Sequence, residues 1–345
     1  MESRAQDGVS GEGRVDVSVL IPTLDEEAYL PGTLDGLRRQ SFDGALEFLF
    51  IDGRSTDRTR QLLESAASED PRIRILDNPE RGIPYALNIG LRSARGSFIA
   101  RMDAHTIYPP DYLAHGVARL RRGDAEWISG PQIPYGTDAG SRAVAAALET
   151  RLGVGGASFR NATREIEVDA GYTGVWRAAT LIAHGGWEES WTVNEDGELA
   201  ARLRAAGGRI VCVPEMGARY VPRNSLRSLA RQYWRYGQFR AKTSAAHPES
   251  MRRSHVLPPL LILTLLAAAL PLGKLSRLPR LGAVLYALAL GATGVSRGGA
   301  EPRQVAAVPV VLITMHIAWG TGFLVGCARF GAPVRALRCL IRATS

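Results

Sequence analysis

Val17-Ser18-Val19-Leu20-Ile21-Pro22 is a short apolar run that is closed by a proline. A run of this length and composition predicts a buried β-strand. The next apolar run, Leu46 to Ile51, ends at Asp52-Gly53, and the segment between the two runs carries leucines at helical spacing. The chain therefore opens with a strand, a helix and a second strand, the pattern typical of a parallel sheet.

This alternation continues further along the chain. Short apolar runs predict more strands at 73–76, 97–100 and 126–129. Periodic apolar positions and turn signals predict helices at 26–39, 56–67, 84–94, 112–120, 198–206 and 226–241, whereas 136–170 are less regular. The predicted fold class is α/β, with a mostly parallel sheet that carries helices on both of its faces.

Charge is distributed unevenly over the 345 residues. The formal net charge is +8, but the segment from Arg252 to the end holds eleven Lys or Arg residues and a single acidic residue, Glu301. Residues 1–251 therefore hold 31 basic and 33 acidic residues. Because the excess of basic residues alternates with apolar runs, it favours a membrane as the partner and argues against nucleic acid.

Cysteine content and the N-terminus narrow the class of protein further. Cys212, Cys327 and Cys339 are odd in number and far apart, which implies neither a disulfide framework nor a zinc site. The polar first 15 residues predict a disordered lead without a secretory signal. The expected organisation is a lead over 1–15, a cytosolic domain over 16–245 and a membrane-associated helical tail over 246–345.

The tail contains three apolar stretches, at 256–273, 281–296 and 304–328. A full crossing takes about 20 apolar residues, so the third is a predicted span, the first is borderline and the second is short. Three crossings would place the basic C-terminus outside, against the positive-inside tendency, whereas two crossings plus a re-entrant or interfacial segment would return it to the cytosol. The sequence leaves both topologies open, and short Arg-containing loops argue against buried helices of a soluble domain.

Four polar clusters lie where a parallel sheet binds its ligands, at the carboxyl ends of strands or before a helix. They are Pro22 to Glu27, Asp52 to Asp57, Asp103-Ala104-His105 and Asn194-Glu195-Asp196. Asp103 and His105 have the residue types and spacing to hold one Mg²⁺ or Mn²⁺ that bridges to phosphate oxygens. The alternative for single members, Asp25 and Thr56 above all, is a helix N-cap.

In this order the clusters resemble the motifs of family 2 glycosyltransferases. Val17 to Glu27 resembles their first strand and loop, and Ile51 to Thr59 their second-strand motif. Asp103-Ala104-His105 matches their Asp-x-Asp position, with His replacing the second Asp. Further matches are Asn78 to Gly90 with the nucleotide-side loop and helix, Asn194-Glu195-Asp196 with the Glu-Asp acceptor motif, and Gln232 to Tyr236 with Gln-x-x-Arg-Trp. The resemblance covers about residues 17–240 and is closest to bacterial exopolysaccharide glucosyltransferases of the succinoglycan type.

The resemblance implies a GT-A fold and an inverting, metal-dependent transfer of a sugar, in the first place glucose from UDP-glucose. The acceptor would be a polyprenyl-linked saccharide, and the site would face the cytoplasm at a bacterial inner membrane. Asp196 is the expected general base, and Asp103 and His105 the expected ligands of Mn²⁺ or Mg²⁺. The expected nucleotide-binding residues are Pro22, Thr23, Asp25, Glu26, Asp52 and Asn88. The expected acceptor-binding residues are Glu195, Gln232, Trp234 and Arg235, with Gly171 to Trp176 as the floor of the acceptor site.

Several alternatives stay open at this level. The alternative for His105 is a packing or hydrogen-bonding role. The alternative for Gln232, Trp234 and Arg235 is a place on an interfacial helix at the lipid headgroups. A processive polysaccharide synthase is the second enzymatic interpretation, opposed by the small number of apolar segments. A membrane scaffold that binds a nucleotide-sugar without turnover is the non-enzymatic one, opposed by Asn194-Glu195-Asp196.

Overall fold

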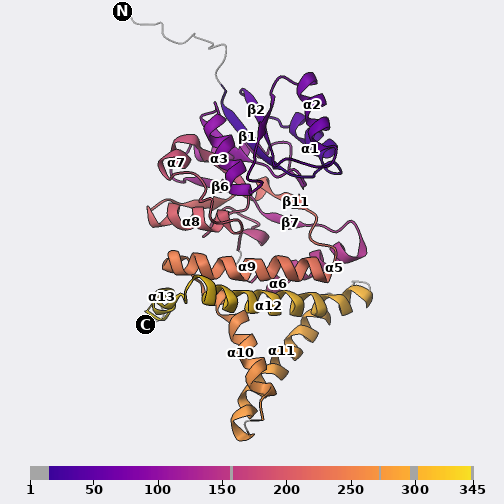
Figure 1. Cartoon of the computed structure of the whole chain (residues 1–345), viewed down its shortest axis with the longest axis vertical. Helices are drawn as coiled ribbons and strands as arrows, with labels where there is room; N and C mark the ends of the chain where they lie inside the picture. Colours follow the sequence, from indigo (N-terminus) through magenta and orange to yellow (C-terminus); the bar gives the residue numbers. More distant parts are fainter. Residues whose placement is uncertain (1–14, 156–157, 272, 296–301, 343–345) are drawn as a thin grey trace, which may run out of the picture.

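The computed structural model describes residues 15–155, 158–271, 273–295 and 302–342. The predicted lead over 1–15 lies almost wholly outside these ranges. Within them, the chain forms an upper α/β domain, a layer of two long helices beneath it, and a helical hairpin that points away from the domain (Figure 1).

The main sheet of the described residues has the strand order β3-β2-β1-β4-β9-β6-β10-β8. Its first four strands in space, β3 (Ile73–Asp77), β2 (Leu46–Asp52), β1 (Val17–Thr23) and β4 (Phe98–Arg101), run parallel. In this register Val19 lies between Phe48 and Ala100. The strands predicted at the start of the chain and at 73–76 and 97–100 are therefore confirmed, and their carboxyl ends meet at one edge.

The second half of the main sheet is mixed in direction. The strand β9 (Gly174–Arg177) runs antiparallel to both β4 and β6 (Trp127–Ser129). The strand β10 (Ile210–Cys212) runs parallel to β6, and β8 (Ile166–Glu167) antiparallel to β10. The insertion of β9 beside β4 brings the Gly171 to Trp176 segment next to the Asp103 loop, which sequence spacing alone did not predict.

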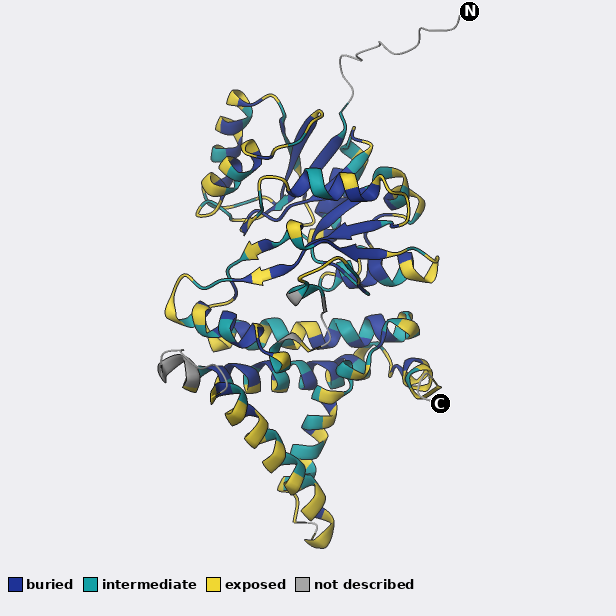
Figure 2. Ribbon diagram, turned by 180° about the vertical axis from the view of Figure 1, so that it is seen from behind, coloured by how far each residue is buried: buried dark blue, intermediate teal, exposed yellow. Residues whose placement is uncertain are grey.

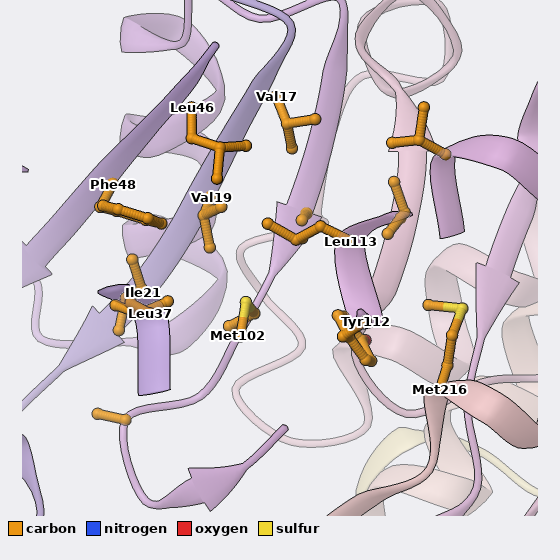
Figure 3. Close-up of a cluster of buried hydrophobic side chains, with 14 of the residues drawn as sticks. Val17, Val19, Ile21, Leu37, Leu46, Phe48, Met102, Tyr112, Leu113 and Met216 are labelled. Atoms are coloured by element: carbon orange, nitrogen blue, oxygen red, sulfur yellow. The ribbon is translucent and has the colours of Figure 1, made fainter. Parts of the chain in front are cut away.

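Alternate residues of β1 pack on opposite faces, as a strand requires. Val17, Val19 and Ile21 join a cluster on one face that includes Leu113 and Met216 (Figure 3). Leu20 joins a second cluster on the other face. The first face is covered by α1 (Leu30–Arg38), α2 (Thr59–Glu69) and α4 (Tyr112–Leu120), and the second by α3 (Ile83–Ser93), α7 (Ala178–Ala183) and α8 (Glu195–Ala205). The α/β fold class with helices on both faces is confirmed.

A small second sheet lies between part of the main sheet and the helical layer (Figure 1). It has the order β5-β11-β7, from Thr106–Ile107, Ala218–Tyr220 and Gln132–Pro134. The less regular region contains α5 (Ala139–Leu148), α6 (Arg151–Val154) and the 3₁₀ turn η1 (Ser158–Asn161). Further 3₁₀ turns are η2 (Pro214–Met216), η3 (Pro248–Ser250), η4 (Arg253–His255) and η5 (Gly273–Ser276).

The helical layer consists of α9 (Leu226–Ala246) and α12 (Pro302–Phe330), which lie side by side (Figure 1). From the far side of α12 the hairpin of α10 (Leu257–Ala269) and α11 (Arg277–Val295) extends away, and α13 (Val334–Arg342) follows at the C-terminal end. By length and composition, Gly273–Val295 and Ala306–Phe330 are the described helices that suffice to cross a membrane, while Arg253–Ala269 is shorter. Their surroundings differ, because the hairpin is largely exposed and α12 has one side buried (Figure 2).

Candidate active site

The loops after β1 and β2 are bound to each other. Asp25, whose φ is 54°, accepts hydrogen bonds at Oδ1 from the Thr56 backbone N–H at 2.6 Å and from Thr56 Oγ1 at 3.2 Å. The Glu26 N–H donates to Thr59 Oγ1 at 2.8 Å. Neither Asp25 nor Thr56 is a helix N-cap, because α1 and α2 begin after Tyr29 and Arg58. The two loops thus form one rim at the carboxyl end of the sheet.

The other residues expected at this rim lie at its base. Asp52, the last residue of β2, is 4% exposed, and its Oδ1 accepts from Ser55 N at 3.1 Å and from Ser55 Oγ at 2.6 Å. The second oxygen, Oδ2, lies 3.7 Å from Nη1 of Arg60. Thr23 is buried and pairs with Asp52 across the two strands, and Pro22 beside it is partly exposed. The structure therefore brings Pro22, Thr23, Asp25, Glu26 and Asp52 together.

Asn88 lies on α3, and its side chain makes hydrogen bonds to a different loop. Its Nδ2 donates to the Trp187 carbonyl at 2.7 Å and to Glu189 Oε1 at 3.0 Å, and its Oδ1 accepts from the Trp187 N–H at 2.9 Å. Both polar atoms of the amide thus hold the 187–189 loop. The structure joins Asn88 to that loop and not to the rim.

The centre of the site is Arg101, the last residue of β4, which is 3% exposed. Its Nε donates to Asp103 Oδ1 at 2.8 Å. Its Nη1 donates to Glu195 Oε1 at 3.0 Å and to Asp196 Oδ1 and Oδ2 at 2.9 and 3.0 Å. One guanidinium thus joins the carboxylate of Asp103 to those of Glu195 and Asp196, which lie more than 90 residues further along the chain.

The pKa values of Asp103 and Asp196, which share this cation, are shifted in opposite directions. Burial would raise the pKa of the Asp103 carboxyl, yet the adjacent Arg101 lowers the pKa below its usual value. Burial raises the pKa of Asp196 to about 7, an effect that Arg101 opposes and that the charges of Glu195 and Asp103 reinforce. A carboxyl group with a pKa near neutrality is suited to accept a proton during a reaction.

The loop after β4 places Asp103 and His105 close to the rim. Oδ2 of Asp103 accepts from the Tyr172 hydroxyl at 3.0 Å, and Nδ1 of His105 lies 2.9 Å from Glu26 Oε1. The hydrogen bond with Glu26 raises the pKa of His105 above its usual value. His105 is therefore bound to the rim through one ring nitrogen, which leaves Nε2 as its remaining ligand atom.

A divalent cation fits this donor set only in company with a ligand. Among the described residues, no three His, Cys, Asp or Glu side chains are grouped so as to hold a metal ion. Asp103 and His105 supply two donors, and Mg²⁺ and Mn²⁺ sites commonly complete their coordination with water and substrate phosphates. The residues present thus fit a cation that is shared with a diphosphate.

The Asn194-Glu195-Asp196 cluster stands at the start of α8. The sequence predicted this helix to start at 198, but it starts at Glu195, so Glu195 and Asp196 lie in its first turn, where carboxylates are favoured by the helix dipole. Asn194 precedes them with a φ of 65° and makes no side-chain cap bond. Its amide instead donates to Thr243 Oγ1 at 2.9 Å and accepts from Arg240 Nη2 at 3.0 Å. The motif is thus fixed to α9.

The remaining acceptor-binding candidates lie on α9. Nε2 of Gln232 donates to the Tyr236 hydroxyl at 2.9 Å, and Trp234 and Arg235 are exposed. Arg101, Asp103, Glu195 and Asp196 are called the Arg101 cluster below. Within the described part of the chain, no hydrogen bond or ion pair joins Gln232, Trp234 or Arg235 to this cluster. The backbone of Trp234 instead faces α12, since a Cβ added to Gly322 would lie 2.1 Å from the Trp234 carbonyl oxygen.

Sequence reasoning missed Arg101 and Arg160. Arg101 stands at the end of an apolar strand, two residues before Asp103, and that spacing was the only signal available. Arg160 lies in the less regular region, where its Nη1 donates to the Tyr220 hydroxyl at 3.0 Å. The Tyr220 ring lies 6.3 Å from the ring of Tyr172, whose hydroxyl donates to Asp103. Arg160 and these two tyrosines therefore form a continuous row of polar and aromatic side chains from Asp103 towards α9.

Comparisons with known proteins agree with this geometry. Residues 18–166 match the model of Glycosyl transferase family 2, and residues 98–324 match that of Glycosyl transferase family group 2. The succinoglycan biosynthesis protein ExoA of Rhizobium meliloti (strain 1021) is 31% identical over 313 residues, which are 88% of this chain and 93% of that protein.

Two further proteins are similar over shorter stretches or in fold. An undecaprenyl-phosphate 4-deoxy-4-formamido-L-arabinose transferase of Pseudomonas paraeruginosa (strain DSM 24068 / PA7) is 32% identical over 111 residues, 31% of this chain and 33% of that protein. The solved structure of the mannosyltransferase PcManGT from Pyrobaculum calidifontis, in complex with GDP-Man and Mn²⁺, has a TM-score of 0.56 at 21% identity and covers 89% of this chain and 87% of that one. This likeness confirms the GT-A fold. The chain belongs to glycosyltransferase family 2 and is a glycosyltransferase.

Proposed function

We propose that the protein transfers a sugar from a nucleotide-diphosphate donor to a polyprenyl-linked saccharide during exopolysaccharide or cell-envelope glycan assembly. UDP-glucose is the first candidate donor. The reaction would invert the anomeric centre and take place at the cytoplasmic face of a bacterial inner membrane. The observation that carries this proposal is the Arg101 cluster, which joins Asp103 to Glu195 and Asp196.

Asp103, on one side of this cluster, suits the leaving group of a displacement reaction, and Asp196, on the other side, suits the attacking group. The nucleotide would rest on the rim of Pro22, Thr23, Asp25, Glu26 and Asp52, with its diphosphate beside Asp103. A cation held there by Asp103 and His105 would neutralise charge that develops on the leaving diphosphate. Asp196 would deprotonate the acceptor hydroxyl on the opposite face of the sugar, as direct displacement requires. Glu195 would orient that hydroxyl.

Relatives support the class of acceptor. One is named for succinoglycan biosynthesis, and another for transfer to undecaprenyl phosphate. The exposed apolar hairpin of this chain supports a site that works beside a membrane, where a polyprenyl carrier is found. We assign Trp234, Gln232 and Arg235 to the acceptor side because α9 also carries Arg240 and Thr243, which hold Asn194.

A donor screen tests this proposal. Membranes with the full chain, Mn²⁺ and extracted lipid-linked saccharides are incubated with UDP- and GDP-sugars, and the release of nucleoside diphosphate and the product length are measured. We expect one sugar per acceptor from a UDP-sugar and a fall of about 10²–10⁴-fold in rate for Asp196→Asn, the range for loss of a general base. Long polymers would instead indicate a processive synthase. UDP binding without turnover would indicate a scaffold, and a full rate for Asp196→Asn would remove Asp196 as the base.

Metal dependence is a separate prediction. Removal of divalent cations by a chelator should abolish transfer, and Mn²⁺ should restore it better than Mg²⁺, because an imidazole ligand suits Mn²⁺ relative to an all-oxygen site. The His105→Asp variant should shift this preference towards Mg²⁺ in a titration of rate against each metal. The His115→Asp variant, changed at a partly exposed histidine on α4, is the control. An unchanged preference in His105→Asp would show that His105 does not ligate the ion.

A further inference from the structure

The hairpin of α10 and α11 exposes apolar side chains around its circumference. Leu260, Leu263 and Leu266 of α10 and Leu281, Leu285 and Leu288 of α11 are each more than half exposed. The buried residues of these two helices are few, among the described ones Pro259, Ile262, Leu290 and Gly294. A helix that is apolar on all sides is stable only when lipid or protein surrounds it. Figure 2 shows these exposed faces pointing away from the domain.

The positions of the charges identify lipid as the surrounding medium. Residues 256–273 and 281–295 contain no Asp, Glu, Lys or Arg. Arg252 and Arg253 stand at the base of the hairpin, and Lys274, Arg277 and Arg280 stand exposed at its tip. At 1.5 Å per residue, the 13 residues of α10 span about 20 Å and the 19 residues of α11 about 28 Å, beside a hydrocarbon thickness of about 30 Å. Basic residues at the base and at the tip of an otherwise uncharged hairpin match the two headgroup layers of a bilayer, which thins locally around a short span.

The long helix α12 is bound to a charged neighbour. Val308, Leu312 and Met315 are buried against α5 and against Leu229 of α9. Glycines allow the two long helices to touch, since a Cβ added to Gly237 would lie 2.1 Å from a carbonyl oxygen of α12. The exposed side of α9 carries Arg227, Arg231 and Arg235. Charges of this kind are expensive in hydrocarbon, so α12 cannot cross the bilayer without leaving α9 or taking it along.

The helix α13 has the pattern of a helix that lies in a membrane surface. Arg335, Arg338 and Arg342 recur at spacings of three and four residues, and Leu337 and Ile341 are exposed between them. Such a helix places its apolar side at the headgroup boundary and its cations among anionic headgroups. It follows α12 after a short turn, and both lie at the base of the hairpin (Figure 1).

We infer that only the α10–α11 hairpin crosses the bilayer, while α9, α12 and α13 stay at the membrane surface on the side of the catalytic domain. The inference rests on the proposed membrane location and adds the topology to it. The two long helices of the layer, α9 and α12, then lie on one side of the bilayer. Arg329, Arg335, Arg338 and Arg342 lie on the cytoplasmic side together with the site, as the positive-inside tendency requires. The 304–328 stretch, predicted from length to be a span, becomes the surface on which the domain rests.

Cysteine accessibility in membrane vesicles tests this topology. Cys339 on α13 is exposed, whereas Cys212 is buried, so a Cys327→Ser chain reports on α13 through its native Cys339. Three matched chains lack both Cys327 and Cys339, and each carries one new cysteine. The new cysteine is Ser68→Cys on the domain, Leu275→Cys at the hairpin tip or Leu263→Cys midway along the hairpin. Each full-length chain is exposed to a membrane-impermeant maleimide in right-side-out and in inverted vesicles, and transfer activity is measured in parallel.

We expect Cys339 and the Ser68→Cys thiol to react in the same vesicles, the Leu275→Cys thiol to react only in vesicles of the opposite orientation, and the Leu263→Cys thiol to react in neither until the chain is denatured. Reaction of Cys339 from the face opposite to the Ser68→Cys thiol would mean that α12 crosses, and would overturn the inference. Protection of the Leu275→Cys thiol in both orientations, or release of the chain by alkaline carbonate, would overturn the crossing of the hairpin. None of these outcomes depends on sugar transfer, so a failed donor screen and a failed topology are distinguishable.

Discussion

Arg101 shows how much of the site depends on a single side chain. Three carboxylates, from Asp103, Glu195 and Asp196, lie in one partly buried cluster with this guanidinium as their shared donor. Like charges held together in a site of low dielectric raise one another's pKa, and a cation between them opposes that effect. The pKa of Asp196 near 7 is the net result of burial and of these opposed charges. We therefore regard Arg101 as a positioning residue for Asp196.

The pH profile of transfer tests that role. If Asp196 is the base, the rate should rise as the pH increases through about 7, because only the deprotonated carboxylate accepts the proton. The Arg101→Lys variant has a single ammonium group in place of the guanidinium. It keeps a cation for folding but weakens the contact with Asp196. We expect kcat to fall roughly 10-fold or more and the midpoint of the profile to move to higher pH. The Arg92→Lys variant, on the exposed side of α3, is the control, and an unshifted profile in Arg101→Lys would reduce Arg101 to a structural role.

The residue types of the site could be predicted from the sequence, but their convergence could not. Asp103, Asp52 and Asp25 stand at predicted strand ends, and parallel strands end at one edge whatever their order. The contact of Arg101 with Asp196 bridges 95 residues and depends on where α8 begins. Asn88 matches the pattern in sequence, yet its amide serves the 187–189 loop, a use that only the packing of α3 reveals.

At the scale of elements, apolar runs predicted the parallel strands because those strands are buried on both faces. Val17–Thr23 and Leu46–Asp52 read as continuous apolar runs for this reason. The strand β9 was missed because it has only four residues and begins with a glycine, and its direction is set by its neighbours β4 and β6. Periodicity placed most helices within a few residues, and it failed at the start of α8, where polar residues begin the helix.

Glu47 joins four neighbouring segments of the sheet. It is 3% exposed on β2, accepts a hydrogen bond from Ser18 Oγ of β1 at 2.6 Å and from the Arg95 N–H before β4 at 2.7 Å, and pairs with Arg74 of β3 at 2.7 Å. Burial would raise its pKa, but these hydrogen bonds and the Arg74 charge outweigh burial and lower the pKa below the usual 4.5. Because the folded pKa is lowered, the ionised group stabilises the fold above about pH 4.5, and this contribution is lost as the pH falls through the folded pKa.

We therefore predict that Glu47→Gln destabilises the protein at pH 7 by about 1.5–3 kcal/mol, the range for hydrogen bonds to charged groups. The difference from the unmodified chain should narrow as the pH is lowered from about 5 towards 3.5. Urea unfolding of the detergent-solubilised protein, followed by tryptophan fluorescence across this pH range, measures it. The Glu64→Gln variant removes an exposed ion pair on α2 and should have little effect. A difference between Glu47→Gln and the parent that is constant with pH would contradict the assignment.

For the molecule as a whole, the contact between α9 and α12 links the site to the helical layer. Arg240 and Thr243 of α9 hold Asn194 beside Glu195 and Asp196, while the other side of α9 packs on α12. Whatever fixes α12 relative to lipid thus also fixes the height of Glu195 and Asp196 above it. A lipid-linked acceptor has a reactive hydroxyl at a set distance from the membrane, so this linkage would determine whether the hydroxyl reaches Asp196.

Gly322→Ala tests this linkage with one methyl group. A Cβ at Gly322 of α12 would lie 2.1 Å from the Trp234 carbonyl oxygen of α9, so the helices must separate, whereas a Cβ at Gly291 of α11 meets nothing within 4 Å. Overpacking of this kind costs about 1–3 kcal/mol. We expect Gly322→Ala to lower the thermal unfolding midpoint and to reduce transfer to a lipid-linked acceptor several-fold more than hydrolysis of the donor by water. Gly291→Ala should leave both rates and the midpoint unchanged or raise the midpoint slightly, since alanine favours the helix. Equal losses of transfer and donor hydrolysis in Gly322→Ala would mean that α12 supports the fold alone and does not position the acceptor site.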